Sequence, residues 1–387
     1  MYVLSADKIF DGKRNKLINN GVITIKDEVI VDVGKKENIH IPRDAEIINL
    51  PEHTLLPGMI DAHSHLSLSV ELEDYLLKVK TSTEELIKRA VDNMTENLNR
   101  GITTLRCPGE KSFIDAVCKD IVKQIPGVGP SLYTAGKGVR SSEGHGFIGY
   151  AVDNINEIKK YYRENKERGA EFFKFYLTSN LPKNGRIAYY YSREKIKKII
   201  STAHSLDRKI AAHAVGGEGL RIALEAGLDM VEHGYFMDQE MMELISANDK
   251  WLVVTNTFLF NDTVNEHLHD REFAEKIRRY RDDVRQRFEI IFDSDINLAL
   301  GTDGYHGALY QEIKLAVKMG LSEYRALKMV TADSARLLNR EDELGSIQAG
   351  KKADIIAVPG NPFNNIDVLS EVNFVMKGGE IIKEREC

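Results

Sequence analysis

Apolar and polar positions follow two different patterns along this chain. Through the middle, short apolar runs typical of buried strands are each followed by a charged segment with helical periodicity. Eight strands are predicted there, at residues 54–60, 102–107, 131–135, 172–176, 209–213, 229–233, 251–255 and 297–301. Helices are predicted most clearly at residues 82–100, 192–205 and 322–338. Eight parallel strands joined by helices over about 250 residues predict a (β/α)8 barrel of the TIM type.

At both ends of the chain the apolar runs are short, and turn residues rather than helices separate them. Strands are predicted at residues 2–6, 21–25 and 29–33, and again at residues 353–358, 374–376 and 380–382. Neither end is long enough to build a good sandwich alone. We therefore expect an α/β protein with two domains: a small β-sandwich built from residues 1–55 and 344–387, and a barrel built from residues 56–343.

Composition narrows the class of protein. The chain has 387 residues, 42% of them hydrophobic, and a formal net charge of −6, which argues against a nucleic-acid-binding protein. The charged run at 276–285 mixes both signs, as a solvated helix face does. Cys107, Cys118 and Cys387 form no close pair, so neither a disulfide framework nor a thiolate metal site is expected. Without an apolar run long enough for a signal peptide or membrane span, we expect a cytoplasmic protein with no membrane partner. Whether it forms a homo-oligomer is left open.

Two histidines stand where the first barrel strand ends. The apolar run at 55–60 leads directly into His63 and His65, and residues two apart in an extended strand point to the same side. The two rings are therefore placed as two ligands of one metal ion would be. Such a pair also arises by chance in surface loops, so it indicates a metal site only together with further candidate ligands elsewhere in the chain.

Further candidate ligands follow other strands of the predicted barrel. Catalytic groups in this fold lie at the C-terminal ends of the strands, where the sequence places Lys174, His213, His233 and Asp303. Each has an ordinary interpretation: a structural histidine, a turn aspartate, or a core lysine in a salt bridge. A buried lysine is nevertheless costly unless it is paired or neutralised. Together with the histidine pair, these residues predict a metal site at the mouth of the barrel.

Several segments resemble the amidohydrolase superfamily of metal-dependent hydrolases, over nearly the whole chain. The matching segments are residues 56–65, 101–106, 231–234, 301–303 and 345–355. The resemblance implies a site for two divalent metal ions. In it, one ion is bound by His63, His65 and Asp303, and the other by His213 and His233. Lys174, carbamylated by CO₂, is implied to bridge the two ions.

The implied chemistry is the hydrolysis of an amide bond. A ligand set of nitrogen and oxygen atoms without thiolates favours Zn²⁺, with Mn²⁺, Fe²⁺ and Co²⁺ as alternatives. A hydroxide bridging the two metals is implied as the nucleophile, because bound metal lowers the pKa of water. Asp303 is implied to be catalytic, accepting the proton of the nucleophile and passing it to the leaving nitrogen.

Parts of the chain resemble one branch of the superfamily, which contains imidazolonepropionase-like enzymes and Xaa-Pro dipeptidases. The resemblance rests on residues 144–146, 211–214 and 223–229. It implies that His145 acts at the substrate carbonyl and that a tyrosine after strand 4 contacts a substrate carboxylate. Tyr191 is favoured among three adjacent tyrosines because it precedes the next helix, although all three could simply pack against the loop. Arg140 is expected to be a solvated loop residue rather than an anion contact.

One segment departs from the branch. After Asp303 the chain carries Tyr305 and His306 where small residues are usual, so His306 is predicted to contact the substrate or to lie just behind the pocket. We expect a small carboxylate-bearing substrate, such as a dipeptide or an N-acyl amino acid. Cyclic amide hydrolysis, deamination and a non-catalytic scaffold remain alternatives. Deaminases carry a glutamate two or three residues after the strand 5 histidine, whereas Glu218 lies five residues after His213. A scaffold would be expected to lose ligands, and this chain keeps all six.

Overall fold

The predicted barrel strands form a closed ring in the computed structural model, which describes residues 1–70, 80–262 and 271–384. The strands run parallel in two arcs, and backbone hydrogen bonds join the arcs at both junctions: Ala62 N donates to Leu300 O (2.9 Å), and Glu171 N donates to Thr134 O (2.9 Å). The first arc consists of β5 (Met59–Asp61), β6 (Ile102–Cys107) and β7 (Ser131–Thr134). The second consists of β10 (Phe172–Tyr176), β11 (Lys209–Gly216), β12 (Met230–Phe236), β13 (Trp251–Val254) and β14 (Asn297–Leu300), with the short β8 (Val139–Arg140) and β9 (Tyr150–Ala151) at its edge. The barrel prediction is confirmed.

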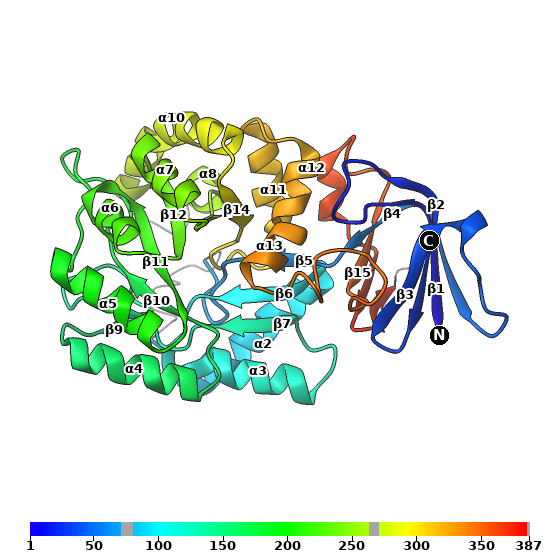
Figure 1. The fold of residues 1–387 in the computed structure, drawn as a ribbon, viewed down its shortest axis with the longest axis horizontal. Helices are drawn as coiled ribbons and strands as arrows, with labels where there is room; N and C mark the ends of the chain where they lie inside the picture. The colour runs from blue at the N-terminus through cyan, green and yellow to red at the C-terminus, as the bar shows by residue number, and fades with distance from the viewer. Residues whose placement is uncertain (71–79, 263–270, 385–387) are drawn as a thin grey trace.

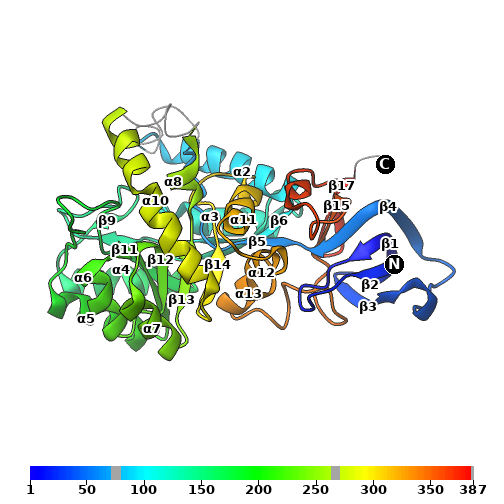
Figure 2. The ribbon, with the colours of Figure 1, turned by 90° about the horizontal axis from the view of Figure 1, so that it is seen from above.

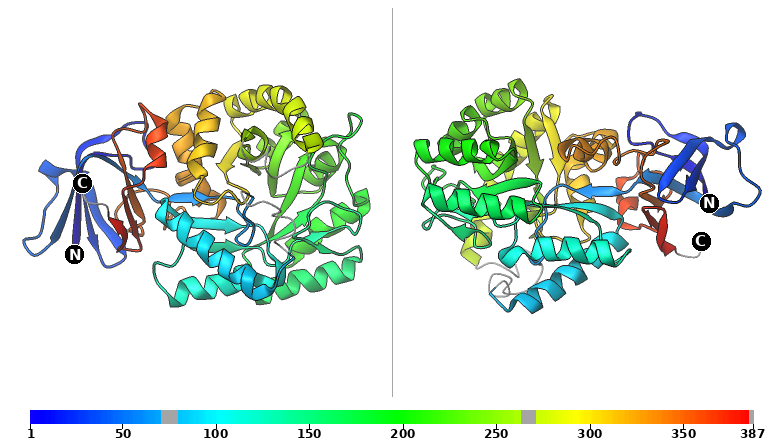
Figure 3. Two further views of the ribbon diagram at one scale, coloured as in Figure 1. Left: turned by 180° about the vertical axis from the view of Figure 1, so that it is seen from behind. Right: turned by 60° about the horizontal axis from the view of Figure 1, so that its bottom comes forward.

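Helices lie around the outside of the ring (Figure 1 and Figure 3). Ser82 caps the first long helix through a hydrogen bond from Glu85 N. The predicted helix at 322–338 is instead two helices, because Thr331 leaves helical geometry (φ −133°, ψ −99°). The helices are α2 (Thr83–Asn99), α3 (Ile114–Gln124), α4 (Ile155–Glu167), α5 (Arg193–Ser205), α6 (Gly217–Glu225), α7 (Gln239–Ala247), α8 (Thr257–Phe260), α10 (Arg271–Asp293), α11 (Leu309–Lys318), α12 (Glu323–Met329) and α13 (Ala332–Leu337), with 3-10 turns η1 (Lys36–Asn38), η2 (Lys111–Phe113) and η3 (Ile366–Ser370).

Both ends of the chain meet in one seven-stranded sheet beside the barrel (Figure 2). Its order is β17-β16-β15-β4-β1-β2-β3, so strands from the two termini pair at β15 and β4. The strands are β1 (Tyr2–Ile9), β2 (Ile18–Lys26), β3 (Val29–Lys35), β4 (Glu46–Pro57), β15 (Ile355–Pro359), β16 (Phe374–Lys377) and β17 (Glu380–Glu384). The sheet has an apolar core of its own, which includes Leu4, Ile23 and Phe374. A terminal β unit is therefore confirmed, while the domain limits at residues 55 and 344 stay a prediction.

The first barrel strand differs from its prediction. The apolar run at 54–60 is divided at Gly58: residues before it end β4 in the terminal sheet, and only residues after it form β5. A Cβ atom on Gly58 would lie 2.2 Å from Thr103 Oγ1, so only glycine allows the backbone to pass β6 this closely. One apolar run thus serves both parts of the fold.

The other end of the barrel is closed by apolar side chains. Phe172, Met230 and Trp251, which are the first residues of β10, β12 and β13, cluster there with small residues such as Ala211 and Ala299. The interior is therefore filled at the end away from the candidate site. Cys107 and Cys118 are buried and form no disulfide within the described residues, and Cys387 lies outside them. Among the described helices, none combines the length and the apolar character that a membrane crossing needs.

Candidate metal centre

The imidazole rings expected from the strand ends lie side by side at the C-terminal mouth of the barrel. His63 and His65 follow β5, and their ring centroids lie 5.4 Å apart. His233, on β12, lies 5.0 Å from the His63 ring and 4.5 Å from the ring of His213 on β11. Four histidines that are up to 170 positions apart in sequence thus form one continuous group.

Asp303 lies among these rings. Its carboxylate is 3.2 Å from His63 Nε2, 3.8 Å from His65 Nε2 and 4.0 Å from His233 Nδ1. One ligand atom from each of His63, His65 and Asp303 lies within 4.8 Å of the others, as in a site that holds a metal ion. The backbone N–H of Asp303 also donates to His63 O (2.8 Å), which ties the end of β14 to the end of β5.

The backbone at this mouth is strained. His233 and Asp303 adopt positive φ angles (79° and 53°), which cost non-glycine residues about 1–3 kcal/mol each. Gly301 brings β14 so close to β5 that a Cβ atom there would lie 2.5 Å from the backbone nitrogen of His63. Strain of this kind persists where the surroundings hold it, and it is common at functional sites.

Hydrogen bonds behind the rings fix their orientation. His63 Nδ1 is 2.5 Å from a carboxylate oxygen of Glu232, and His65 Nδ1 is 2.8 Å from Gly109 O. His233 Nδ1 is 2.7 Å from Thr255 Oγ1. Metal-ligating histidines usually engage the second ring nitrogen in this way, because the contact fixes the tautomer and the ring plane.

Three nitrogen atoms at the centre are buried and have no hydrogen-bond partner among the described residues: His63 Nε2, Lys174 Nζ and His213 Nε2. The contact of His63 Nε2 with Asp303 is an ion-pair distance without hydrogen-bond alignment. Unpaired polar atoms in a protein interior are costly and uncommon, and here they gather at one place with a carboxylate. Their nitrogen and oxygen donors fit divalent metal ions.

Burial controls the charges of the ligands. It lowers the pKa of His65 to about 3, and it lowers the pKa values of His213 and His233 well below the ordinary range. These rings are therefore neutral near pH 7, as metal ligation requires. Burial also lowers the pKa of Lys174 to about 8, which raises the share of neutral amine. The pKa of Asp303, despite burial, is held below its usual range chiefly by the adjacent His63 ring, whose own pKa is raised by Glu232, so Asp303 is a carboxylate.

The residues predicted to contact substrate occupy different positions. The His145 ring lies 4.7 Å from that of His213, beside the ligand group, and burial lowers its pKa to about 4. Tyr191 is buried, and its hydroxyl donates a hydrogen bond to Val152 O, so the hydroxyl is engaged within the protein. His306 is enclosed, with Nε2 2.7 Å from Leu68 O and Nδ1 3.0 Å from Asn97 Nδ2. Both of its ring nitrogens are thus engaged within the protein.

Two other residues weighed from the sequence lie apart from the ligand group. Glu218 is exposed on α6 and forms ion pairs with Arg193 and Arg221, which gives no support to a deaminase glutamate. Arg140 bonds the carbonyls of its own loop, including that of Ser141 (2.9 Å).

Sequence reasoning missed three polar residues that the structure brings to the centre. Glu232 contacts His63, and Arg106 contacts Glu232 in turn (2.8 Å). Tyr176, two residues after Lys174 on β10, is buried, its hydroxyl has no hydrogen-bond partner within the described part of the chain, and its ring lies 5.8 Å from that of His213. The sequence did hold one indication of these residues: each is a charged or polar residue inside an apolar run that predicts a fully buried strand.

Comparisons with known proteins agree with this geometry. Residues 54–383 match the model of the amidohydrolase family. The ochratoxinase of Aspergillus niger is 25% identical, over 95% of this chain and 83% of its own length. The imidazolonepropionase of Fusobacterium nucleatum is 24% identical, over 87% of this chain and 84% of its own length. A crystal structure of a Xaa-Pro dipeptidase with methionine bound in the active site superposes with a TM-score of 0.88 and 28% identity, covering 99% of both chains.

Proposed function

The chain belongs to the amidohydrolase family, whose members act as hydrolases on carbon–nitrogen bonds, and from that premise we propose that it cleaves an amide bond of a small, carboxylate-bearing molecule at a two-metal centre. In this proposal His63, His65 and Asp303 hold one ion, and His213 and His233 hold the other. Lys174, as a CO₂-derived carbamate, would supply oxygen ligands to both. Zn²⁺ is the favoured metal because all ligands are nitrogen or oxygen atoms.

The observation that carries the proposal is the group of buried, unpartnered nitrogens of His63, Lys174 and His213 beside the Asp303 carboxylate. A fold does not maintain three such atoms together without a partner for them. A carbamate on Lys174 would replace a buried cation by an anion, which balances the positive charge of two metal ions.

Bound metal would supply a lowered pKa for water and polarisation of the scissile carbonyl. Asp303, a carboxylate at neutral pH, accepts a proton from the attacking water and delivers it to the leaving nitrogen. His145 is neutral and lies beside His213, so it can donate a hydrogen bond to the substrate carbonyl oxygen. Water adds to the carbonyl carbon as the C–N bond breaks, which yields a carboxylic acid and an amine.

For the substrate we propose a dipeptide or an N-acyl amino acid. The support comes from relatives whose names describe a Xaa-Pro dipeptidase and an ochratoxinase. The imidazolonepropionase relatives favour a second candidate, a cyclic amide. Tyr191 and His306, both engaged within the protein, enter the proposal only as walls of the substrate pocket. A cytoplasmic location stays a prediction, and the oligomeric state stays open.

The test is to measure metal content and activity on the same preparation. Zn²⁺-loaded protein is screened against Xaa-Pro dipeptides, N-acyl amino acids and cyclic amides, with Asp303→Asn as the inactive variant and Glu218→Gln as the matched surface control. We expect two metal ions per chain and turnover of at least one amide class that Asp303→Asn loses and Glu218→Gln keeps. One metal per chain with ammonia release would favour deamination, and activity confined to amidines or phosphoesters would contradict the substrate proposal.

A further inference from the structure

A fully buried ion pair lies inside the barrel directly behind the candidate metal centre. Arg106, on β6, is 1% exposed, and Glu232, on β12, is fully buried. Arg106 donates to Glu232 Oε1 (2.8 Å), while the other carboxylate oxygen, Oε2, lies 2.5 Å from His63 Nδ1. Arg106 on β6, Glu232 on β12 and His63 just after β5 thus form a continuous chain of contacts from the barrel interior to a candidate ligand.

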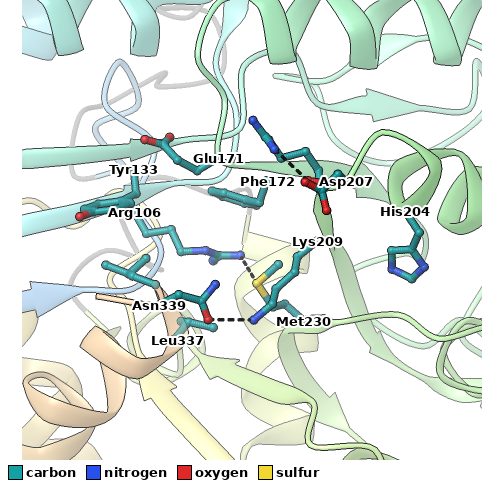
Figure 4. Close-up of a pocket in the computed structure, with 12 residues that line it drawn as sticks. Arg106, Tyr133, Glu171, Phe172, His204, Asp207, Lys209, Met230, Leu337 and Asn339 are labelled. Atoms are coloured by element: carbon teal, nitrogen blue, oxygen red, sulfur yellow. Dashed lines mark hydrogen bonds between the residues drawn. The ribbon is translucent and has the colours of Figure 1, made fainter. Parts of the chain in front are cut away.

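The Arg106 guanidinium is held from several sides. It donates to Ala62 O (2.9 Å) and to Met230 Sδ (3.2 Å), and it lies 4.1 Å from the centroid of the Phe172 ring. Figure 4 shows the Arg106 side chain lying between Phe172 and Met230. The planar guanidinium of Arg106 is fixed by the Phe172 ring and by the Ala62 carbonyl, so it has little freedom to rotate. One of its edges is therefore held toward Glu232.

A contribution to the free energy of folding does not account for the buried Arg106–Glu232 ion pair. Removing two charges from water costs several kcal/mol per ion, and a buried ion pair is often no more stabilising than apolar residues of the same size. Residues 101–106 were singled out in the sequence, yet Arg106 has no place among the proposed ligands or catalytic groups. What the pair does have is one contact with the site, at His63 Nδ1.

We infer that Arg106 and Glu232 are positioning residues that present His63 Nε2 to the metal. The Glu232 carboxylate accepts the Nδ1 proton of His63, which fixes the tautomer and leaves Nε2 free as a ligand. Arg106 keeps the carboxylate in place and balances its charge. This inference rests on the proposed function, since it needs a metal at His63.

Among the described residues, the lining of the cavity beyond Arg106 supplies no alternative hydrogen-bond partner for this cation. Its volume is about 490 Å³, and its lining includes Tyr133, Glu171, Lys209 and Asn339 (Figure 4). The polar groups at its rim bond to one another or to neighbouring elements: Lys209 Nζ donates to Asn339, and Glu171 pairs with Lys119. The hydrogen bonds of Arg106 run to Ala62, Met230 and Glu232, all parts of the barrel itself.

The test measures Zn²⁺ affinity by competition with a chromogenic chelator, after the purified full-length protein has been stripped of metal. Glu232→Gln keeps the shape of the side chain but removes the charge. We expect its Zn²⁺ affinity to fall by about 10–100-fold, the usual effect of losing an outer-shell partner. The visible absorption of the Co²⁺-loaded protein should also change, because the ligand field at His63 is altered.

Two further variants separate positioning from folding. Arg106→Met combined with Glu232→Gln removes both charges, so it avoids an uncompensated buried ion, and it should bind Zn²⁺ as weakly as Glu232→Gln alone. Asp115→Asn is the matched control, because Asp115 is a buried carboxylate that accepts hydrogen bonds from Gly136 N (2.7 Å) and Ala116 N (2.9 Å) away from the site. It should lower the melting temperature and leave Zn²⁺ affinity unchanged.

The outcomes distinguish the two proposals. Wild-type affinity and an unchanged Co²⁺ spectrum in Glu232→Gln, or in the double variant if the single one does not fold, would overturn the positioning role while leaving the metal centre intact. A wild-type protein that binds no Zn²⁺ would overturn the proposed function and this inference with it.

Discussion

The side-chain nitrogen of Lys174 lies 5.2 Å from the ring centroid of Tyr176, two residues further along β10. Both side chains are buried, and neither the amine nor the hydroxyl has a hydrogen-bond partner among the described residues. The Tyr176 ring is enclosed in turn by Gly138, Gly146 and Gly149 of the loop that carries His145. Lys174 is therefore buried beside an aromatic ring whose own position is restricted by these glycines.

Lys174→Ala should abolish activity and reduce bound metal to less than one ion per chain, since the proposed bridge between the two ions is lost. Metal content measured by mass spectrometry, together with amide turnover, checks this. Acetate or propionate added with Zn²⁺ should restore part of both, because a small carboxylate can occupy the place of the carbamate. Full activity in Lys174→Ala without added carboxylate would show that the bridging role is wrong.

Gly146→Ala should damage the site through Tyr176. Gly146 has φ +103°, and a Cβ atom there would lie 2.4 Å from Tyr176 Cδ1, so either the ring or the loop carrying His145 must move. We expect a loss of stability above the roughly 1–2 kcal/mol of backbone strain alone, and a fall in kcat. Thermal unfolding and steady-state kinetics measure the two effects.

Gly169→Ala is the matched control for that variant. Gly169 also has a positive φ (+83°), but nothing lies within 4 Å of the position that its Cβ would occupy. This variant should show the backbone strain only, with unchanged kcat. Equal effects of the two substitutions on both stability and kcat would mean that the contact with Tyr176 does not hold the His145 loop.

The fold and the ligand group could be predicted because each depends on a local pattern. Apolar runs of strand length predicted the barrel, and polar residues where those runs end predicted His63, His213 and Asp303, since all strand ends of a parallel barrel meet at one mouth. The division of one apolar run at Gly58 was not predicted, because hydrophobicity does not tell which sheet a strand joins.

Contacts that depend on tertiary packing could not be predicted. Arg106 and Glu232 are 126 positions apart, and only the closure of the barrel brings them together. The sequence alone could not tell which of Tyr189, Tyr190 and Tyr191 would contact a substrate, because the path of a long loop sets the neighbours of each ring. In the structure, the Tyr191 hydroxyl donates to Val152 O.

Removal of metal should destabilise the protein reversibly. No described residue hydrogen-bonds the buried nitrogens His63 Nε2, Lys174 Nζ and His213 Nε2. A ligand that binds only the folded state stabilises it by about 4 kcal/mol at a thousandfold excess over Kd. For a chain of this length that corresponds to roughly 5 °C in Tm. Scanning calorimetry before chelation, after it and after adding back Zn²⁺ checks this, with Mg²⁺ as the control ion. A Tm that chelation leaves unchanged would contradict a structural contribution of the metal.

Glu312 should make the protein less stable at alkaline pH. The side chain is 1% exposed and accepts hydrogen bonds from the backbone N–H groups of Asn256 (3.0 Å) and Thr257 (2.5 Å). Burial raises its pKa from 4.5 to about 8. Between pH 4.5 and pH 8, Glu312 therefore holds a proton in the folded state that it has already released in the unfolded state. The stability gained from this proton is complete below about pH 4.5 and is lost as the pH rises through 8.

The measurement compares Tm from pH 5 to pH 9 in the wild type and in Glu312→Gln, whose amide does not titrate. The advantage in Tm of the wild type over the variant should shrink by a few degrees across that range, because only the wild type must bury a charge at high pH. Glu167→Gln, at an exposed position on α4, should follow the wild-type pH dependence throughout. A difference between wild type and Glu312→Gln that stays constant from pH 5 to pH 9 would show that Glu312 does not titrate in this window in the folded protein.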